Sequence, residues 1–221
     1  MSEMLPLNFI INKISEGAFS QALHALRKKR LEAARDILIA AIRIGEKDIY
    51  DAAQVDEFVA IVDRYMRAAQ EGTARLNLQL LAKIVAGQKE MGAFIASDFL
   101  HYADVLSSLE REEIIFLGCM YKHSQFMVID PAKNFKANPE KAASLAFAKM
   151  GELLIPSVFS NPIDMAATAS AITRSGLLLS VPAIGGTYGY RITPFLEKLC
   201  ELASFEDVIG KEYSANPTKV A

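Results

Sequence analysis

Apolar residues recur every three or four positions from Asn8 to about Phe126, the spacing that places side chains on one face of a helix. The clearest stripes are Leu31, Ala34, Leu38 and Ala41; Val55, Phe58, Val59, Val62, Tyr65, Met66 and Ala69; Leu76, Leu80, Leu81 and Ile84; and Ile114, Leu117, Gly118 and Tyr121. Each stripe needs a partner surface, which neighbouring helices supply. The first part of the chain is therefore predicted to be a bundle of about five or six helices.

Breaks in this pattern mark the organisation of the chain. Short breaks are expected at residues 45–51, at Gly72 and at GQKEMG, residues 87–92. The longer stretch VIDPAKNFKANPEK, from Val128, combines two prolines, two asparagines and three lysines, a composition typical of a linker. The division that follows is a helical bundle at 1–130, a linker at 131–138, a second unit at 139–210 and a flexible tail at 211–221.

Helix-start signals punctuate the second unit. Asn138, Asn161 and Thr193 each precede a proline, and this pair suits an N-cap residue followed by proline at the first helical position. Gly176 suits the left-handed conformation that ends a helix. Between residues 177 and 193 the apolar LLLSV, the turn residues PAIGG and the alternating YGYRI predict a β-hairpin.

The order helix, helix, strand, turn, strand, helix, with ITRSGLL followed by YGYRITPFLEKLCEL, resembles the winged helix-turn-helix of MarR-like and related families. The resemblance covers residues 139–205, less than a third of the chain. The expected fold class is mainly α, a helical bundle followed by a winged-helix-like α+β subdomain with one small β-hairpin. The resemblance implies a recognition helix at Pro162–Ser175 and a wing tip at Gly185–Gly186. It also implies that Arg174 and Arg191 contact phosphates.

The side chains of this segment differ from those of a DNA-reading helix, which offers basic, amide or hydroxyl groups to bases and phosphates. PIDMAATASAITRS contains one arginine and one aspartate among alanines and small hydroxyls, and the wing adds only Arg191. Tight DNA binding commonly uses about six phosphate contacts. We therefore interpret the unit as a protein-docking or packing module. The expected partner surface consists of Arg174, Tyr188, Tyr190 and Arg191.

A sequence-specific DNA-binding regulator is the alternative. It would dimerise through the N-terminal helices and leave the helix Pro162–Ser175 exposed on one side. Its phosphate contacts, Arg174, Arg191 and the basic run from Arg27 to Arg30, would share a face. The apolar stripes of the bundle also favour self-association of the protein.

Composition narrows the classes of function. The 221 residues are 52% hydrophobic, enough for a sizeable core, and a formal net charge of −2 does not predict strong nonspecific affinity for nucleic acid. The chain opens without a secretory pattern, and its longest apolar run within a helix pattern, ILIAAI at 37–42, is far shorter than the roughly 20 residues that span a bilayer. We expect a cytoplasmic protein without a transmembrane segment.

The densest basic run is Arg27, Lys28, Lys29 and Arg30. We interpret it as a solvated turn between two helices, in which the cations offset the dipole of a helix C-terminus. Contact with phosphates and binding to an anionic lipid surface are the alternatives. Lipid binding would require Phe9, Ile10 and Phe19 to be exposed together.

Two residue pairs have side chains of the kinds found in catalytic or metal sites, but neither pair forms a complete site. Cys119 and His123 are four residues apart, and Asp98 and His101 are three apart, so each pair shares a helical face but supplies only half a metal site. Nucleophile-elbow, zinc-protease and di-iron motifs are absent from the sequence. We expect reduced cysteines, no catalytic residue, no metal and no cofactor, and hence a non-catalytic interaction or regulatory protein. An uncharacterised enzyme is the remaining alternative.

Overall fold

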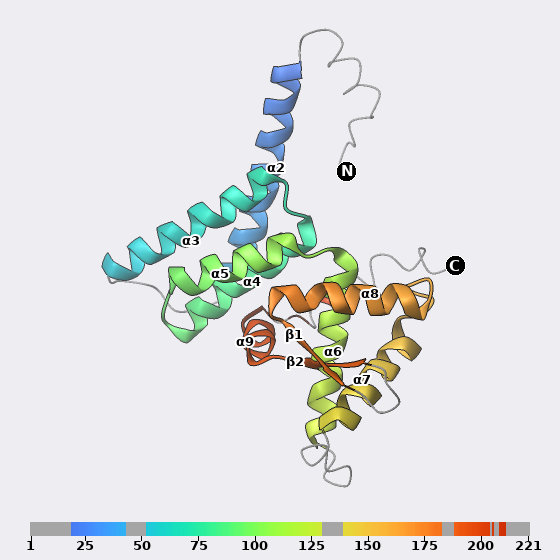
Figure 1. Ribbon diagram of the computed structural model, residues 1–221. Helices are drawn as coiled ribbons and strands as arrows, with labels where there is room; N and C mark the ends of the chain where they lie inside the picture. The colour runs from blue at the N-terminus through green and yellow to red at the C-terminus, as the bar shows by residue number, and fades with distance from the viewer. Residues whose placement is uncertain are drawn as a thin grey trace.

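The computed structural model describes residues 19–42, 52–129, 139–182, 188–203, 205 and 208–210. In this part of the chain the protein is mainly α-helical, with one two-stranded antiparallel hairpin near the C-terminal end (Figure 1). The expected fold class, helices followed by a small hairpin, is confirmed at this level. The predicted linker at 131–138 and the predicted tail at 211–221 lie outside the described residues.

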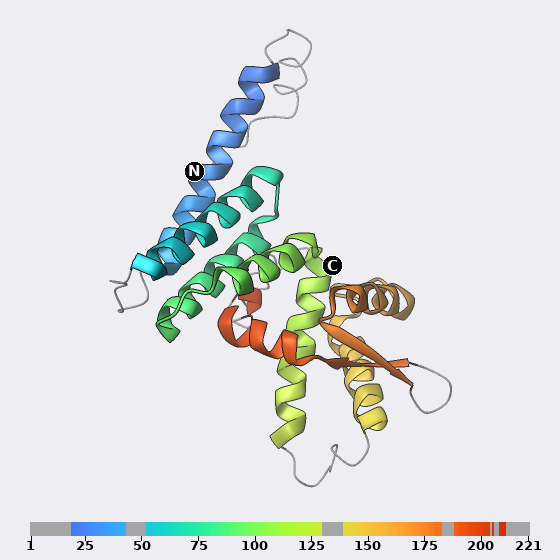
Figure 2. The ribbon, with the colours of Figure 1, turned by 60° about the vertical axis from the view of Figure 1, so that its left-hand side comes forward.

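The described residues of the first part of the chain form five helices: α2 (Phe19–Ile42), α3 (Ala52–Glu71), α4 (Arg75–Met91), α5 (Ala96–Ser108) and α6 (Arg111–Ile129). α3, α4 and α5 pack side by side, and α2 packs on α3 and α4 while its first half extends beyond them (Figures 1 and 2). The α2 stripe of Ala34, Leu38 and Ala41 is buried in this contact. The apolar stripe of α3 is only partly covered by neighbouring helices, since Val55 and Val59 are about half exposed.

Two of the three predicted breaks lie within the described residues: the break at Gly72 ends a helix, and the break at residues 87–92 does so only at Gly92. Gly72 (φ 104°) follows α3, and Gly92 (φ 76°) follows α4 in the left-handed conformation that glycine adopts without strain. α4 continues through Gly87, so the break expected from residue 87 is wrong. Gly87 lies there because a neighbouring helix comes close. The break expected at residues 45–51 lies outside the described residues.

The second part contains α7 (Pro139–Leu154), α8 (Pro162–Ile172), the 3-10 turn η2 (Thr173–Ser175), β1 (Leu178–Pro182), β2 (Tyr188–Ile192) and α9 (Pro194–Ala203). All three predicted helix starts are confirmed. At α8, Asn161 Oδ1 accepts hydrogen bonds from the backbone N–H groups of Ile163 (2.9 Å) and Asp164 (3.0 Å). Gly176 (φ 73°) ends the η2 turn, as predicted.

The hairpin packs on α7 through a close approach of backbones. β1 and β2 pair in an antiparallel register that places Leu178 opposite Ile192 and Pro182 opposite Tyr188. A Cβ atom at Gly189 of β2 would lie 2.8 Å from the carbonyl carbon of Ala143 in α7. Glycine at position 189 therefore allows β2 to lie directly against the helix.

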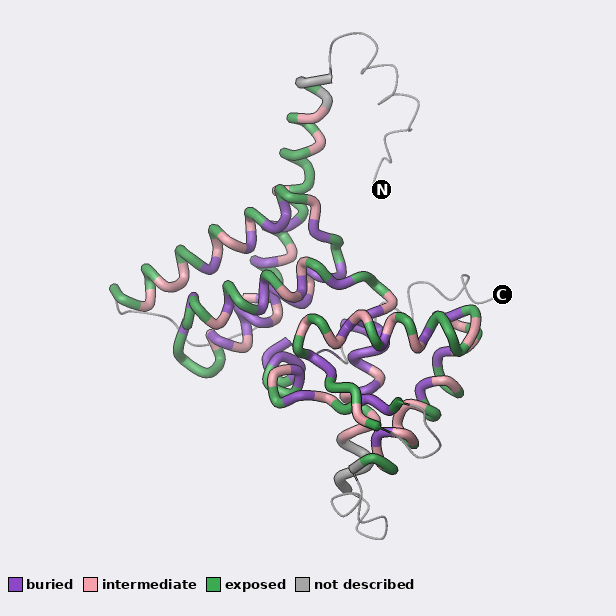
Figure 3. Tube along the Cα trace, viewed as in Figure 1, coloured by how far each residue is buried: buried purple, intermediate pink, exposed green. Residues whose placement is uncertain are grey.

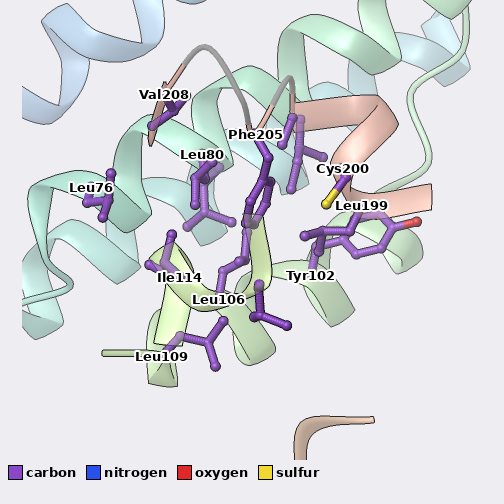
Figure 4. Packing of buried hydrophobic residues seen from close by; sticks show 14 of the residues in the cluster. Leu76, Leu80, Tyr102, Leu106, Leu109, Ile114, Leu199, Cys200, Phe205 and Val208 are labelled. Atoms are coloured by element: carbon purple, nitrogen blue, oxygen red, sulfur yellow. The ribbon is translucent and has the colours of Figure 1, made fainter. Parts of the chain in front are cut away.

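α9 joins the second part to the bundle. It packs along α4, where a Cβ atom at Gly87 would lie 2.6 Å from the carbonyl oxygen of Leu202. Buried side chains of α4, α5, α6 and α9 then meet in one cluster, in which Leu80, Ile114 and Leu199 lie close together (Figure 4). None of the described helices combines the length and apolarity needed to cross a membrane.

We expect Gly87→Ala to lower the free energy of unfolding by about 1–3 kcal/mol, because the new methyl group forces α9 away from α4. Gly151→Ala in α7 is the matched control, since its Cβ would meet only Met165 Cε at 3.7 Å. The control gains helix propensity of up to about 1 kcal/mol. Urea unfolding followed by circular dichroism measures both variants. Equal stabilities would contradict the close-packing argument.

Candidate functional site

α8 occupies the position of the predicted recognition helix and is exposed on one side. Its buried side consists of Met165, Ala169 and Ile172, and it packs on α6, η2 and β1. Its exposed side chains are those of Pro162, Ile163, Asp164, Ala167 and Ser170. α8 itself carries no basic residue, so its exposed side offers little attraction for phosphates.

Arg174, the first basic residue after α8, faces a carboxylate. Its side chain is 73% exposed, and Nη2 lies 3.8 Å from Oε1 of Glu113, which is nearly buried in the first turn of α6. Glu113 also accepts a hydrogen bond from the backbone N–H of Glu110 (2.8 Å), half of a capping box. The charge of Arg174 is therefore partly offset by a fixed carboxylate.

The two tyrosines of the hairpin have different environments. Tyr188 is 67% exposed, whereas Tyr190 is 7% exposed and packs on the ring of Phe147 in α7 at 5.0 Å between centroids. Burial raises the pKa of the Tyr190 phenol, which a hydrogen bond with Ser170 partly opposes. Tyr190 therefore belongs to the core and not to an exposed partner surface. Tyr188 and Arg191 are exposed.

The basic run lies inside α2 and is not a turn, so that expectation is wrong. Arg30 Nη2 donates to the carbonyl oxygens of Gly72 (2.8 Å) and Thr73 (3.5 Å), just after the last residue of α3. Arg30 does interact with the C-terminus of a helix, as expected of the run. That helix is α3, whose end lies 42 residues away in sequence, and not a helix next to the run. Arg27 and Lys28 line a groove between α2 and α3.

The basic run Arg27–Arg30 and the pair Arg174 and Arg191 lie at opposite ends of the molecule. The first half of α2 extends from one end of the bundle, and α8 and the hairpin occupy the other end in both views (Figures 1 and 2). Within one chain they do not form the shared face that the DNA-binding alternative predicts. Figure 3 shows exposed residues along the first half of α2, whereas α8 and the hairpin alternate exposed and buried residues.

A second groove, of about 440 Å³, lies between α4, the α4–α5 connection and α9. Small side chains form much of its wall, and Lys198 Nζ donates to Asp98 Oδ2 at its edge (2.8 Å). The hydrogen bond with Asp98, followed by one with Tyr102, raises the pKa of Lys198. His101, three residues from Asp98, stacks on Phe195 at 4.7 Å and does not line the groove. Asp98 and His101 therefore do not converge on one cavity.

Cys119 and His123 do not form a metal site with other described side chains. The described residues contain no group of three or more histidine, cysteine, aspartate or glutamate side chains arranged to hold a metal ion. Cys119 is partly buried, and burial raises the pKa of its thiol, which disfavours the nucleophilic thiolate. Phe9 and Ile10, which the lipid-surface alternative requires, and the side chain of Phe19 lie outside what the structure describes.

The comparisons with known proteins add no relative. No protein-family model, curated protein or solved structure matches this chain. Contacts, exposure and charge of the residues themselves therefore indicate the function.

We expect Arg30→Gln to lower the free energy of unfolding by about 0.5–1.5 kcal/mol, because the carbonyl groups at the end of α3 lose a charged donor. Lys28→Gln is the control: it removes the same charge from the same run but no hydrogen bond at the end of α3. It should change stability by less than about 0.5 kcal/mol. Thermal unfolding measures both, and equal losses would indicate a general charge effect.

Tyr190→Ala should destabilise the protein by about 3 kcal/mol or more, because it removes an aromatic ring from the α7–hairpin contact. Tyr188→Ala removes an equal number of atoms from an exposed position and should stay within about 0.5 kcal/mol of the wild type. Urea unfolding distinguishes the two. A similar effect at both positions would contradict the assignment of Tyr190 to the core.

Proposed function

We propose that this chain is a non-catalytic interaction or regulatory protein, and that its C-terminal part is a winged-helix-like module used for protein docking. The order of α7, α8, β1, β2 and α9 supports the winged-helix interpretation. The observation that carries the docking proposal is the exposure of large apolar side chains on the recognition-helix position and the hairpin. These are Ile163 at 78%, Leu179 at 57% and Tyr188 at 67%.

Apolar and aromatic side chains suit a protein partner better than a DNA groove. Protein interfaces enrich aromatic and aliphatic anchors at their centres and exclude most charges from them. A DNA-reading surface at the same position needs several cations, whereas α8 and the hairpin offer Arg174, already close to Glu113, and Arg191. Asp164 adds a negative charge in the first turn of α8.

The first partner to test is a second copy of the chain. Most soluble oligomers are homo-oligomers, and a symmetric dimer uses the same patch on both copies. We expect the full-length protein to dimerise in a concentration-dependent manner, measured by size-exclusion chromatography with light scattering. The double variant Ile163→Asp/Leu179→Asp should raise the dissociation constant at least about tenfold, equivalent to about 1.4 kcal/mol, because it buries carboxylates in the interface.

Met91→Asp is the matched control, since Met91 is 72% exposed but belongs to α4. It should leave the dimer unchanged. A dimer that withstands the double variant would contradict docking through the module. The same run with mixed-sequence duplex DNA tests the regulator alternative: a DNA complex that Arg174→Gln/Arg191→Gln abolishes would replace the docking proposal.

A further inference from the structure

A groove of about 620 Å³ lies between the first half of α2 and the last turn of α3. Its lining residues are His24, Arg27, Lys28, Leu31, Arg67, Gln70 and Glu71. The apolar Leu31 is half-buried, and the polar side chains on both helices are exposed. The groove is thus an open channel between two helices with mainly basic edges.

The charges of the lining residues do not cancel. Three cations, Arg27, Lys28 and Arg67, stand against one carboxylate, Glu71, which gives a net charge of 3 − 1 = +2 without His24. Glu71 also lies 3.8 Å from Nη1 of Arg64, so part of its charge is offset from outside the groove. His24 and Gln70 add ring and amide hydrogen-bond donors.

Within the part of the chain that the structure describes, the three lining cations have no carboxylate partner. Among the described residues no ion pair involves Arg27, Lys28 or Arg67, whereas the exposed Lys149 and Lys198 pair with Glu152 (2.6 Å) and Asp98 (2.8 Å). Arg30, a further cation of the region, donates hydrogen bonds to the carbonyl groups that follow α3. Like charges held in one groove repel each other, and a bound anion relieves that repulsion.

We infer that this groove binds the phosphodiester backbone of a nucleic acid without sequence specificity. Cations on two helices that border an open channel match a ligand with a row of phosphates, and arginine and lysine supply most backbone contacts in nucleic-acid complexes. An anionic membrane fits less well. The exposed described side chains between residues 21 and 30 of α2 are polar or alanine, and Leu23 and Leu26 are half-buried, so no large apolar side chain described in this stretch is fully exposed for insertion.

The proposal has a quantitative signature in the salt dependence. Three phosphate contacts predict a slope of about −2.7 in a plot of log association constant against log salt, and hence a loss of about 40-fold in affinity between 50 and 200 mM salt. The measurement is fluorescence anisotropy of a labelled mixed-sequence 20-base-pair duplex, titrated with the full-length protein at several salt concentrations.

Two double variants identify the binding surface. Arg27→Gln/Arg67→Gln removes two of the three groove cations and should reduce the slope to about −0.9, so that the same salt change costs only about fourfold. Arg174→Gln/Arg191→Gln removes the same charge from the C-terminal module and should leave the slope unchanged. Circular dichroism and thermal unfolding verify that both variants are folded, and Arg27→Lys/Arg67→Lys should keep the wild-type slope.

Other outcomes would overturn the proposal. Absence of salt-dependent binding by the wild type at 50 mM salt would exclude it. Binding that only Arg174→Gln/Arg191→Gln weakens would move the contact to the C-terminal module. Binding to vesicles with anionic phospholipids but not to the duplex would assign the groove to a membrane surface. The dimerisation assay does not depend on the groove variants, so either proposal can fail without the other. Only DNA binding through Arg174 and Arg191 would overturn both.

Discussion

α9 lies so close to α4 that the crossing leaves no room for a side chain at residue 87, and this contact, together with the packing of α7 and α8 on α6, places the C-terminal part on the bundle. Close approach of two helices buries their backbones and flanking side chains together, which is why Leu199, Leu202 and Ala203 are buried. Phe195 and Lys198 hold α9 against α5, through a ring stack with Tyr102 (5.6 Å) and an ion pair with Asp98 (2.8 Å). α9 therefore has a defined position on the bundle.

The position of α9 fixes the hairpin through Thr193. Thr193 is the only residue between β2 and α9, and its hydroxyl donates to the carbonyl of Gly176 (2.8 Å) and accepts from the backbone N–H of Leu196 (3.2 Å). One buried hydroxyl thus links the end of the η2 turn, the end of the hairpin and the first turn of α9. Gly189 then allows β2 to lie against α7. The exposure of α8 and Tyr188 follows from these contacts.

The features that the sequence predicted are those with local causes. The helix starts at Pro139, Pro162 and Pro194 are signalled by two adjacent residues of the sequence, and the hairpin is signalled by a change of period from helical to alternating. The burial of Tyr190 depends on Phe147, 43 positions earlier, and nothing local distinguishes it from Tyr188. The role of Gly87 is equally hard to predict from local sequence, since a glycine inside a helical pattern signals either a break or a close packing partner.

Local sequence is equally insufficient to predict the electrostatic field around the basic run Arg27–Arg30. Net charge and local runs describe the chain, whereas the field at a surface depends on which acids lie within about 10 Å, the screening length near 0.1 M salt. Asp36 follows the run in sequence but pairs with Arg35 (3.1 Å), and Glu71 is the one carboxylate among the residues that line the groove. Arg67 reaches the same groove only because α3 packs on α2. A chain with a formal charge of −2 therefore presents a locally positive groove that its composition does not reveal.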